Sequence, residues 1–311
     1  MTTNTSQSSK KSKPSFSSWI KAFRLRTLPL ALSSILMGSF LAIHDGTYNW
    51  LIIFLAAVTT TLLQILSNLA NDYGDSQKGT DNISRLGPQR TVQSGEISPS
   101  QMKKGIWVFS ILSLITGLLL LYISFGDDFL TTLLFFIIGV AAIFAAIKYT
   151  VGKGAYGYAG FGDLFVFLFF GIVGVTGTYF LNTGSIKWDV FLPAISIGFL
   201  STGVLNLNNM RDMDNDIRSG KHTLASRLGY HTSKMYQVFL VIGAIVAALV
   251  YVGLYFETAW NFLFLLVSPL LIKDLFSVFN QNEQAKLDPY LKKLALGTFL
   301  FTIVFGIGIL T

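Results

Sequence analysis

Long apolar stretches separated by short polar segments dominate the pattern of this chain. Each is long enough, or nearly so, to cross a bilayer as a helix of about 20 residues. The nine stretches lie at 28–44, 50–70, 105–125, 129–148, 163–181, 189–209, 234–256, 259–280 and 292–310. The pattern predicts an all-α membrane protein of about nine transmembrane helices. It leaves no room for a separate soluble domain.

Composition agrees with this class and removes several kinds of chemistry. The chain is 52% hydrophobic and 13% charged, roughly half the charge of a soluble domain. It contains no cysteine, which excludes disulfides, thiolate metal sites and cysteine nucleophiles. Its three histidines, His44, His222 and His231, form no paired ligand motif. We expect residues 1–18, rich in Ser, Thr and Lys, to be a disordered tail, and residues 19–311 to be one transmembrane domain.

The basic residues predict how the chain is oriented. If the loops alternate and the N-terminus lies inside, all but one of the 23 Lys and Arg residues fall on the inner side, and Lys187 is the exception. The positive-inside rule therefore predicts a cytoplasmic N-terminus. This distribution also accounts for the net charge of +7, so the charge does not indicate a nucleic-acid partner. The polar lead, without a small-residue cleavage site, predicts an uncleaved first helix.

Two acidic clusters end the second and the sixth apolar stretches. The first runs from Asn68 to Asp75 and is followed by Asp81, and the second runs from Asn208 to Asp216. In each, an Asn precedes an Asp by four residues. Carboxylates at this depth are costly and usually mark a functional site. The repeat predicts two four-helix halves plus one first helix, with one site built from both halves.

Helical spacing brings the polar residues of each cluster onto one face. These residues are Asn68, Asp72 and Asp75 in the first cluster, and Asn208, Asp212 and Asp216 in the second. Converging carboxylates call for cations between them, and Mg²⁺ combines a few carboxylates with phosphate oxygens. Lys and Arg on the same side can bind phosphate directly. The basic residues are Arg85, Arg90, Lys148, Lys153, Arg211, Arg218 and Lys221. We therefore expect a metal-bridged polyphosphate here.

Other interpretations fit the residues less well. Asp212, Asp214 and Asp216 have the spacing of a calcium loop, but Ile217 replaces the required Gly and Thr223 the required Glu. The glycine-rich segment 152–162 lacks the P-loop pattern. A secondary transporter also shows repeats and buried acids. Here the acids end their helices among basic residues, which favours an enzyme.

Five segments resemble the intramembrane aromatic prenyltransferases of the UbiA superfamily. SNLANDYGDSQKGTDN at 67–82 is similar to the first Asp-rich motif of that family, and NNMRDMDNDIRSGKHTLASRLG at 208–229 to the second. Three more resemble its menaquinone branch, the 1,4-dihydroxy-2-naphthoate polyprenyltransferases. They are FRLRTLPLAL at 23–32, RLGPQRTVQSGEIS at 85–98 and GYAGFGDLFVFLFFG at 157–171. The resemblance extends from about residue 19 to the end of the chain.

The resemblance implies a reaction. A polyprenyl chain would pass from polyprenyl diphosphate to 1,4-dihydroxy-2-naphthoate, with release of diphosphate and CO₂, giving demethylmenaquinone. It implies a multi-pass protein of the bacterial inner membrane, with loops 71–104 and 211–233 over a cytoplasmic active site. The implied partners are the two substrates and the lipid bilayer. Rival acceptors for the same fold are 4-hydroxybenzoate, homogentisate and a tetrapyrrole.

The resemblance also implies roles for residues. The implied Mg²⁺ ligands are Asp72, Asp75, Asp212, Asp216, Asn68 and Asn208. The implied catalytic residues are the same four Asp residues with Lys148 and Tyr149. The implied substrate contacts are Asn68, Asn208, Arg24, Arg85, Arg90, Lys153 and Lys221. Asp81 and Asp214 depart from the pattern of the ubiquinone branch, which leaves their roles open. The chain length of the donor and the oligomeric state are also open.

Overall fold

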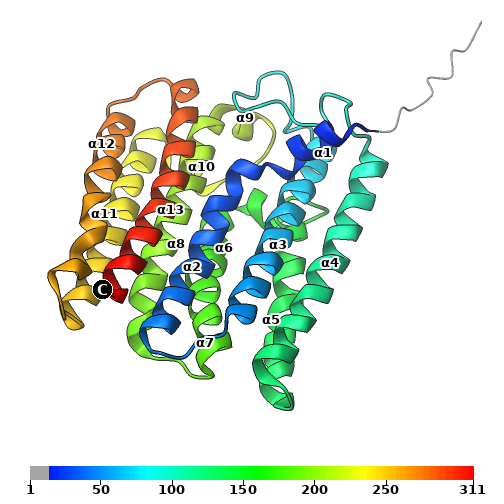
Figure 1. Ribbon diagram of the computed structural model, residues 1–311. Helices are drawn as coiled ribbons and strands as arrows, with labels where there is room; N and C mark the ends of the chain where they lie inside the picture. The colour runs from blue at the N-terminus through cyan, green and yellow to red at the C-terminus, as the bar shows by residue number, and fades with distance from the viewer. Residues whose placement is uncertain (1–13) are drawn as a thin grey trace, which may run out of the picture.

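The computed structural model describes residues 14–311, so most of the expected N-terminal tail lies outside the described residues. Over residues 14–311 the chain is helical and contains no strand. Nine helical segments in this range are long and apolar enough to cross a membrane, which confirms the predicted class. Figure 1 shows them side by side in one bundle.

The first five segments precede the second acidic cluster. They are α1 Phe16–Phe23 with α2 Leu28–His44; α3 Trp50–Lys78; α4 Pro99–Phe125; α5 Phe129–Lys148; and a composite of α6 Gly162–Val166, a π-helix at Phe167–Thr176 and α7 Gly177–Thr183. Helix α1 begins after the N-cap Ser15. The prediction of a disordered tail is therefore wrong for residues 16–18, where an N-cap and an amphipathic turn form a helix.

The remaining four segments follow the second acidic cluster or end in it. They are α8 Phe191–Arg211; α11 Tyr230–Leu254; a 3-10 helix at Ala259–Leu266 with α12 Ser268–Phe279; and α13 Asp288–Leu310. Two short helices, α9 Met213–Arg218 and α10 Leu224–Leu228, lie between α8 and α11. The segment expected as loop 211–233 is thus largely helical.

Helices α3 and α4 are longer than their apolar stretches. Helix α3 continues through the first acidic cluster and ends at Gly79, whose φ of 72° is the left-handed cap that glycine favours. Helix α4 starts with a capping box between Ser98 and Gln101, followed by Pro99. The loop expected at 71–104 is therefore reduced to residues 79–98. The first acidic cluster consequently belongs to a rigid helix.

The fifth segment joins the two halves of the bundle. Helices α3, α4 and α5 pack against one another, whereas α8, α11, α12 and α13 form the other group. The π-helix packs on α8 and α2. At Gly171, an added Cβ would lie 2.6 Å from Cα of Gly198, so this crossing needs glycine. The close approach fixes α8, and hence the second acidic cluster, relative to α2.

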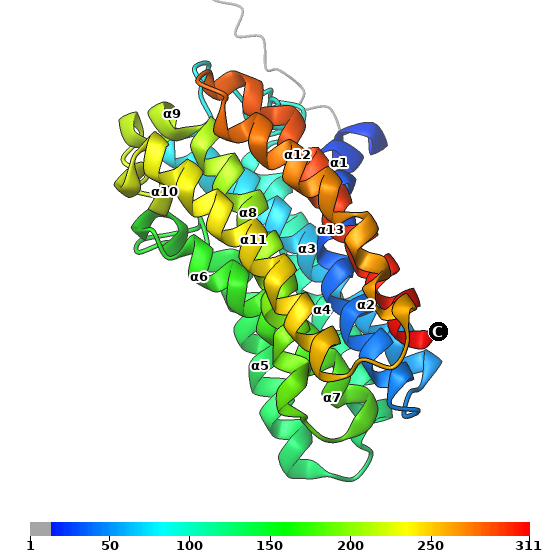
Figure 2. The ribbon, with the colours of Figure 1, turned by 90° about the vertical axis from the view of Figure 1, so that its left-hand side faces the viewer.

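Both acidic clusters lie at the same end of the bundle. Figure 1 shows α1, α9 and the connection from α3 to α4 together at the upper end, and the view in Figure 2 agrees. The turns that follow α2 and α7 lie at the opposite end. The fold therefore brings together two clusters that are far apart in the sequence.

Candidate active site

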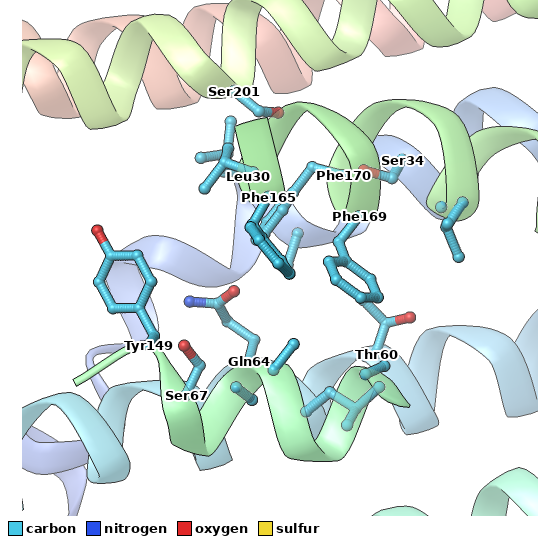
Figure 3. A pocket seen from close by; sticks show the side chains of 18 of the residues that line it. Leu30, Ser34, Thr60, Gln64, Ser67, Tyr149, Phe165, Phe169, Phe170 and Ser201 are labelled. Carbon is cyan, nitrogen blue, oxygen red and sulfur yellow. The ribbon is translucent and has the colours of Figure 1, made fainter. Parts of the chain in front are cut away.

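A cavity of about 670 Å³ lies within the bundle. Its polar end is lined by residues of both acidic clusters, and apolar side chains from α2 to α8 line the rest. Figure 3 shows Gln64, Tyr149, Phe165 and Phe169 pointing into it. Along α3 the lining runs from Asp75 to Ala56, which is about 28 Å at 1.5 Å per residue. This shape suits a ligand with a charged head and a long apolar tail.

The residues of the first acidic cluster that line the cavity are Asn68, Asn71 and Asp75. The amide nitrogen of Asn68 donates to the carbonyl of Phe23 at 3.0 Å and to Oγ1 of Thr27 at 2.9 Å. These bonds hold the bend between α1 and α2 against α3. Asp75 is buried and lines the cavity.

Asp72, an expected metal ligand, does not line the cavity. Its carboxylate accepts hydrogen bonds from N and Oγ1 of Thr91, at 3.2 and 2.6 Å, and from N of Val92 at 3.4 Å. At about 100° per helical residue, Asp72 and Asn71 lie on opposite sides of Asn68. The cavity lies on the side of Asn71, and the loop before α4 covers the side of Asp72. The structure therefore does not support Asp72 as a ligand and places it as the anchor of this loop.

Sequence reasoning missed Asn71, although the sequence held the signal. Asn71 and Asp75 are themselves four residues apart, like Asn208 and Asp212. All four of these residues line the cavity, whereas Asp72 of the pair Asn68 and Asp72 does not, which favours a correspondence between Asn71 with Asp75 and Asn208 with Asp212. In this register Gly79 occupies the position that corresponds to Asp216 of the second cluster. The lining of the cavity thus favours a register of the repeat that is shifted by three residues from the predicted one.

On the second cluster, Asn208, Asp212 and Asp216 all line the cavity, as the helical spacing predicted. Buried Arg211 donates from Nε and Nη2 to the two carboxylate oxygens of Asp212, at 3.0 and 2.6 Å. It also donates to Oδ1 of Asn208 at 2.9 Å. Burial by itself would raise the pKa of Asp212, but the hydrogen bonds and charge of Arg211 hold it below its usual value. Asp212 is therefore a carboxylate.

Asp216 has a different environment. Its Oδ2 lies 3.3 Å from Nζ of Lys221, and burial raises its pKa to about 6. The same oxygen is buried and accepts no hydrogen bond. Burial would lower the pKa of Lys221, but Asp216 and the neighbouring carboxylates raise it. The result is a charged lysine beside an acid with spare capacity for a cation or a donor.

Tyr158 connects the first cluster to the segment that follows the second cluster, and it was not predicted. Its hydroxyl lies 2.8 Å from Oδ1 of Asp75 and 2.6 Å from Oγ1 of Thr80. Its carbonyl accepts from the backbone N of His222 at 3.1 Å, and Nζ of Lys78 lies 3.7 Å from its ring centroid. Tyr158 belongs to the glycine-rich segment 152–162. The many glycines of this segment suggested a connection between helices, and so they gave no signal for a residue that contacts the site.

Asp81 and Asp214, the two acids with open roles, both lie outside the cavity lining. Oδ1 of Asp81 is 3.2 Å from Nε of Arg85 and 3.8 Å from Nε of Arg90. Burial, with a contribution from Asp75, raises the pKa of Asp81 to about 6. Asp214 accepts from Gln284 at an exposed position, 3.1 Å away. Asp81 thus orders two arginines, and Asp214 belongs to the outer surface.

The expected basic residues divide into two groups. Arg24, Arg85, Arg90 and Lys221 line the cavity, and so do Arg26 and Lys292, which were not predicted. The structure does not bring Lys148 and Lys153 into the lining: Lys153 is exposed, and Nζ of Lys148 lies 5.9 Å from the ring centroid of Phe144. Both were expected because they lie on the same side of the bundle as the acidic clusters, but a position on that side does not by itself bring a side chain into the cavity.

Arg24 occupies an unusual backbone position. It is the one non-glycine residue within 14–311 that has a positive φ, 50°. This conformation separates α1 from α2, and strain of this kind is often found at functional sites. Nη2 of Arg24 is buried and has no hydrogen-bond partner. The cavity therefore offers an anion one unpaired donor here.

Aromatic rings form one wall of the cavity. Tyr149, expected at the site, lines it together with Tyr156, Phe165 and Phe169. The rings of Tyr149 and Tyr156 meet edge to face with centroids 5.3 Å apart, and Tyr156 stacks on Phe165 at 4.0 Å. Such faces attract a cation that is shielded from water. The wall extends from the polar end toward the apolar part.

The donor set fits Mg²⁺ that arrives together with phosphate oxygens. Within the described residues, no three Asp, Glu or His side chains are close enough to hold a metal by themselves. Mg²⁺ usually needs one or two carboxylates, the remaining ligands being water and substrate phosphate. The carboxylate and amide oxygens that the two acidic clusters offer at the cavity come from Asp75, Asp212, Asp216, Asn68, Asn71 and Asn208.

Comparisons with known proteins agree with this geometry. Residues 31–303 match the UbiA prenyltransferase family. The chain is 43% identical to a 1,4-dihydroxy-2-naphthoate octaprenyltransferase of Haemophilus influenzae, covering 94% of this chain and 95% of the relative. It is 39% identical to the Escherichia coli protein of the same name, covering 94% of each.

Solved structures show the same fold at low sequence identity. A UbiA homologue from Aeropyrum pernix, solved in its apo form, superimposes with a TM-score of 0.65 at 14% identity, covering 94% of this chain and 97% of the other. A UbiA homologue from Archaeoglobus fulgidus, bound to DMAPP and Mg²⁺, gives 0.61 at 16% identity, covering 92% and 98%. The family match spans most of the chain, and the motifs that suggested it line one cavity. This chain belongs to the UbiA prenyltransferase family.

Proposed function

We propose that this chain transfers a polyprenyl group from polyprenyl diphosphate to 1,4-dihydroxy-2-naphthoate, releasing diphosphate and CO₂ and giving demethylmenaquinone. The observation that carries the proposal is the single cavity with acids and bases at one end and an apolar interior beyond. The names of the relatives at 43% and 39% identity support the acceptor.

The polar end has the residues to hold a diphosphate with Mg²⁺. Asp75, Asp212 and Asp216, with the amide oxygens of Asn71 and Asn208, would hold the metal. When bound, Mg²⁺ supplies Lewis-acid neutralisation of the charge on the leaving diphosphate. The side chains of Arg85, Arg90, Arg24 and Lys221 would bind the phosphate oxygens that face them. Nη2 of Arg85 lies 3.6 Å from Oδ2 of Asp212, so a phosphate-binding group and a metal-binding group are adjacent at this end of the cavity.

The chain's aromatic wall and apolar lining protect the reacting group. Departure of diphosphate leaves an allylic cation on the prenyl group, and the faces of Tyr149 and Tyr156 can each stabilise it by about 1–2 kcal/mol when water is absent. Water would capture this cation as an alcohol, so a dry cavity favours attack by the naphthoate ring. Loss of CO₂ then restores aromaticity. No histidine is needed as a base.

We place the site at the cytoplasmic face of a bacterial inner membrane. The end that holds both acidic clusters also carries the loops rich in Lys and Arg, whereas Lys187 lies in the turn after α7. The positive-inside rule assigns the basic end to the cytoplasm.

An acceptor panel tests the proposal. Membranes containing the protein receive a labelled polyprenyl diphosphate, Mg²⁺ and either 1,4-dihydroxy-2-naphthoate, 4-hydroxybenzoate or homogentisate. We expect labelled product with the naphthoate alone, and its loss when EDTA removes divalent ions. Labelling of another acceptor would assign the chain a different branch of the family. Turnover that persisted in EDTA would contradict the role of the metal.

A further inference from the structure

The cavity ends in a floor of large side chains at its apolar end. Leu121 of α4, Phe135 of α5 and Phe180 of α7 line it there. Phe135 and Phe180 stack with centroids 5.2 Å apart. Phe125 does not line the cavity and packs behind both rings, 5.0 Å from Phe135 and 5.9 Å from Phe180. Three helices thus close the apolar end with interlocked rings.

Three glycines lie one helical turn nearer the polar end, on these same helices. Gly117 precedes Leu121 by four residues, Gly139 follows Phe135 by four, and Gly177 precedes Phe180 by three. All three line the cavity. A Cβ added at Gly139 or Gly177 would meet no atom within 4 Å, and one at Gly117 would meet only the methyl of Thr59, at 3.9 Å.

These glycines are not explained by helix packing. At Gly174, also in the lining, an added Cβ would lie 2.7 Å from Cβ of Ser34, so glycine there permits contact between helices. Gly117, Gly139 and Gly177 permit no such contact. Glycine inside a helix costs about 0.5–1 kcal/mol relative to alanine. The three glycines instead leave the cavity wide next to its floor, where larger side chains would narrow it.

The depth of the cavity compares with the length of a prenyl tail. Extended chain advances roughly 1.2 Å per bond, so an isoprenoid unit of four chain bonds covers about 5 Å. The distance of about 28 Å from Asp75 to Ala56 along α3 thus matches roughly six extended units. A tail of eight units reaches the floor and must coil in the width above it. The glycines lie where that coil would form.

We propose that the three glycines and the aromatic floor together gauge the prenyl tail, admitting the terminal units of long donors such as octaprenyl diphosphate. This inference rests on the proposed function and adds a specificity for tail length. It concerns only units far from the diphosphate. Donors too short to reach the glycines do not touch the gauge.

Substitutions that narrow the cavity at these glycines test the proposal. We compare transfer of geranyl (two units) and octaprenyl (eight units) groups to 1,4-dihydroxy-2-naphthoate by wild type, Gly117→Leu and Gly177→Leu. Gly253→Leu is the matched control, because this helix glycine also has no atom within 4 Å of an added Cβ and lies outside the cavity. In the two cavity variants the octaprenyl-to-geranyl ratio should fall at least about tenfold, with geranyl transfer unchanged.

Several results would overturn the gauge. An unchanged ratio in both cavity variants would do so, as would an equal fall in Gly253→Leu or loss of geranyl transfer in the cavity variants. A complementary variant, Phe180→Ala, opens the floor and should raise the ratio of decaprenyl to octaprenyl transfer; no rise contradicts the floor. In Gly117→Leu and Gly177→Leu, labelled octaprenyl diphosphate should also bind more weakly in a saturation binding measurement. If wild type transfers neither group, the proposed function itself fails, and the binding measurement still decides on the gauge.

Discussion

At the residue scale, the proposed Mg²⁺ ligands on α3 depend on which side of this helix faces the cavity. Three acids predicted from the sequence, Asp75, Asp212 and Asp216, line the cavity; they could be singled out because charged residues inside apolar helices are few. The sequence could not separate Asp72 from Asn71. They are neighbours in the sequence, and only the covering loop, through Thr91 and Val92, distinguishes their environments.

Substitution of single acids should reveal this difference. Asp75→Asn should lower transfer by about 100-fold or more, since it removes a charge from the metal site, where even outer-shell changes cost 10–100-fold. Asp72→Asn should lower it less than about tenfold, because the amide oxygen can still accept from Thr91 and a net hydrogen bond is worth about 1 kcal/mol. Steady-state rates measure both, with exposed Asp214→Asn as the control. Equal losses at positions 72 and 75 would contradict the cavity face assigned to α3.

Tyr158 should act as a positioning residue for Asp75. Tyr158→Phe removes the hydroxyl that lies 2.8 Å from Oδ1 of Asp75 and keeps the ring beneath Lys78. We expect the Mg²⁺ concentration for half-maximal transfer to rise by about 10–100-fold, the usual effect of losing an orienting partner of a ligand. A Mg²⁺ titration of the rate measures this. An unchanged Mg²⁺ requirement would show that Tyr158 has a packing role alone.

At the element scale, periodicity and length predicted the crossing helices better than their ends. The first apolar stretch was expected at 28–44, and α2 spans Leu28–His44. The expected loop 71–104 failed because α3 buries its polar last turns, which hydropathy treats as solvent-exposed. The π-helix of the fifth segment was not predicted, since an apolar stretch of this length does not distinguish a π-helix from an α-helix.

That approach should be sensitive to a single side chain. Gly171→Val places atoms where Cα of Gly198 already lies 2.6 Å from the added Cβ. We expect a loss of about 1–3 kcal/mol in stability, as for other overpacked interiors. Thermal unfolding in detergent measures it, and Gly253→Val serves as the control because its added Cβ meets no atom within 4 Å. Equal melting temperatures for the two variants would contradict the importance of this crossing.

At the scale of the whole molecule, the bundle turns a weak sequence repeat into one site. The composition and the two motifs were enough to predict the class and the family, because both follow from local residue patterns. The apolar end of the cavity was beyond prediction, since its floor joins Leu121, Phe135 and Phe180 from three helices. The orientation in the membrane was inferred from charge alone.

The absence of cysteine makes that orientation testable. Ser100→Cys lies at the start of α4, near the acidic clusters, and Ser185→Cys lies in the exposed turn after α7. In intact cells, a membrane-impermeant maleimide should label Ser185→Cys and leave Ser100→Cys unlabelled until the membrane is opened. The reverse pattern would place the site on the outer face.

The central claim is that two clusters from the two halves of the chain form one site. A double-mutant comparison of Mg²⁺-dependent geranyl transfer to 1,4-dihydroxy-2-naphthoate tests it most directly. Residues that act as a unit are strongly non-additive. We therefore predict that Asp75→Asn and Asp212→Asn each lower the rate by about 100-fold or more, and that the double variant is no worse than the poorer single one. Losses that multiply, or a near-normal rate in either single variant, would contradict a shared site.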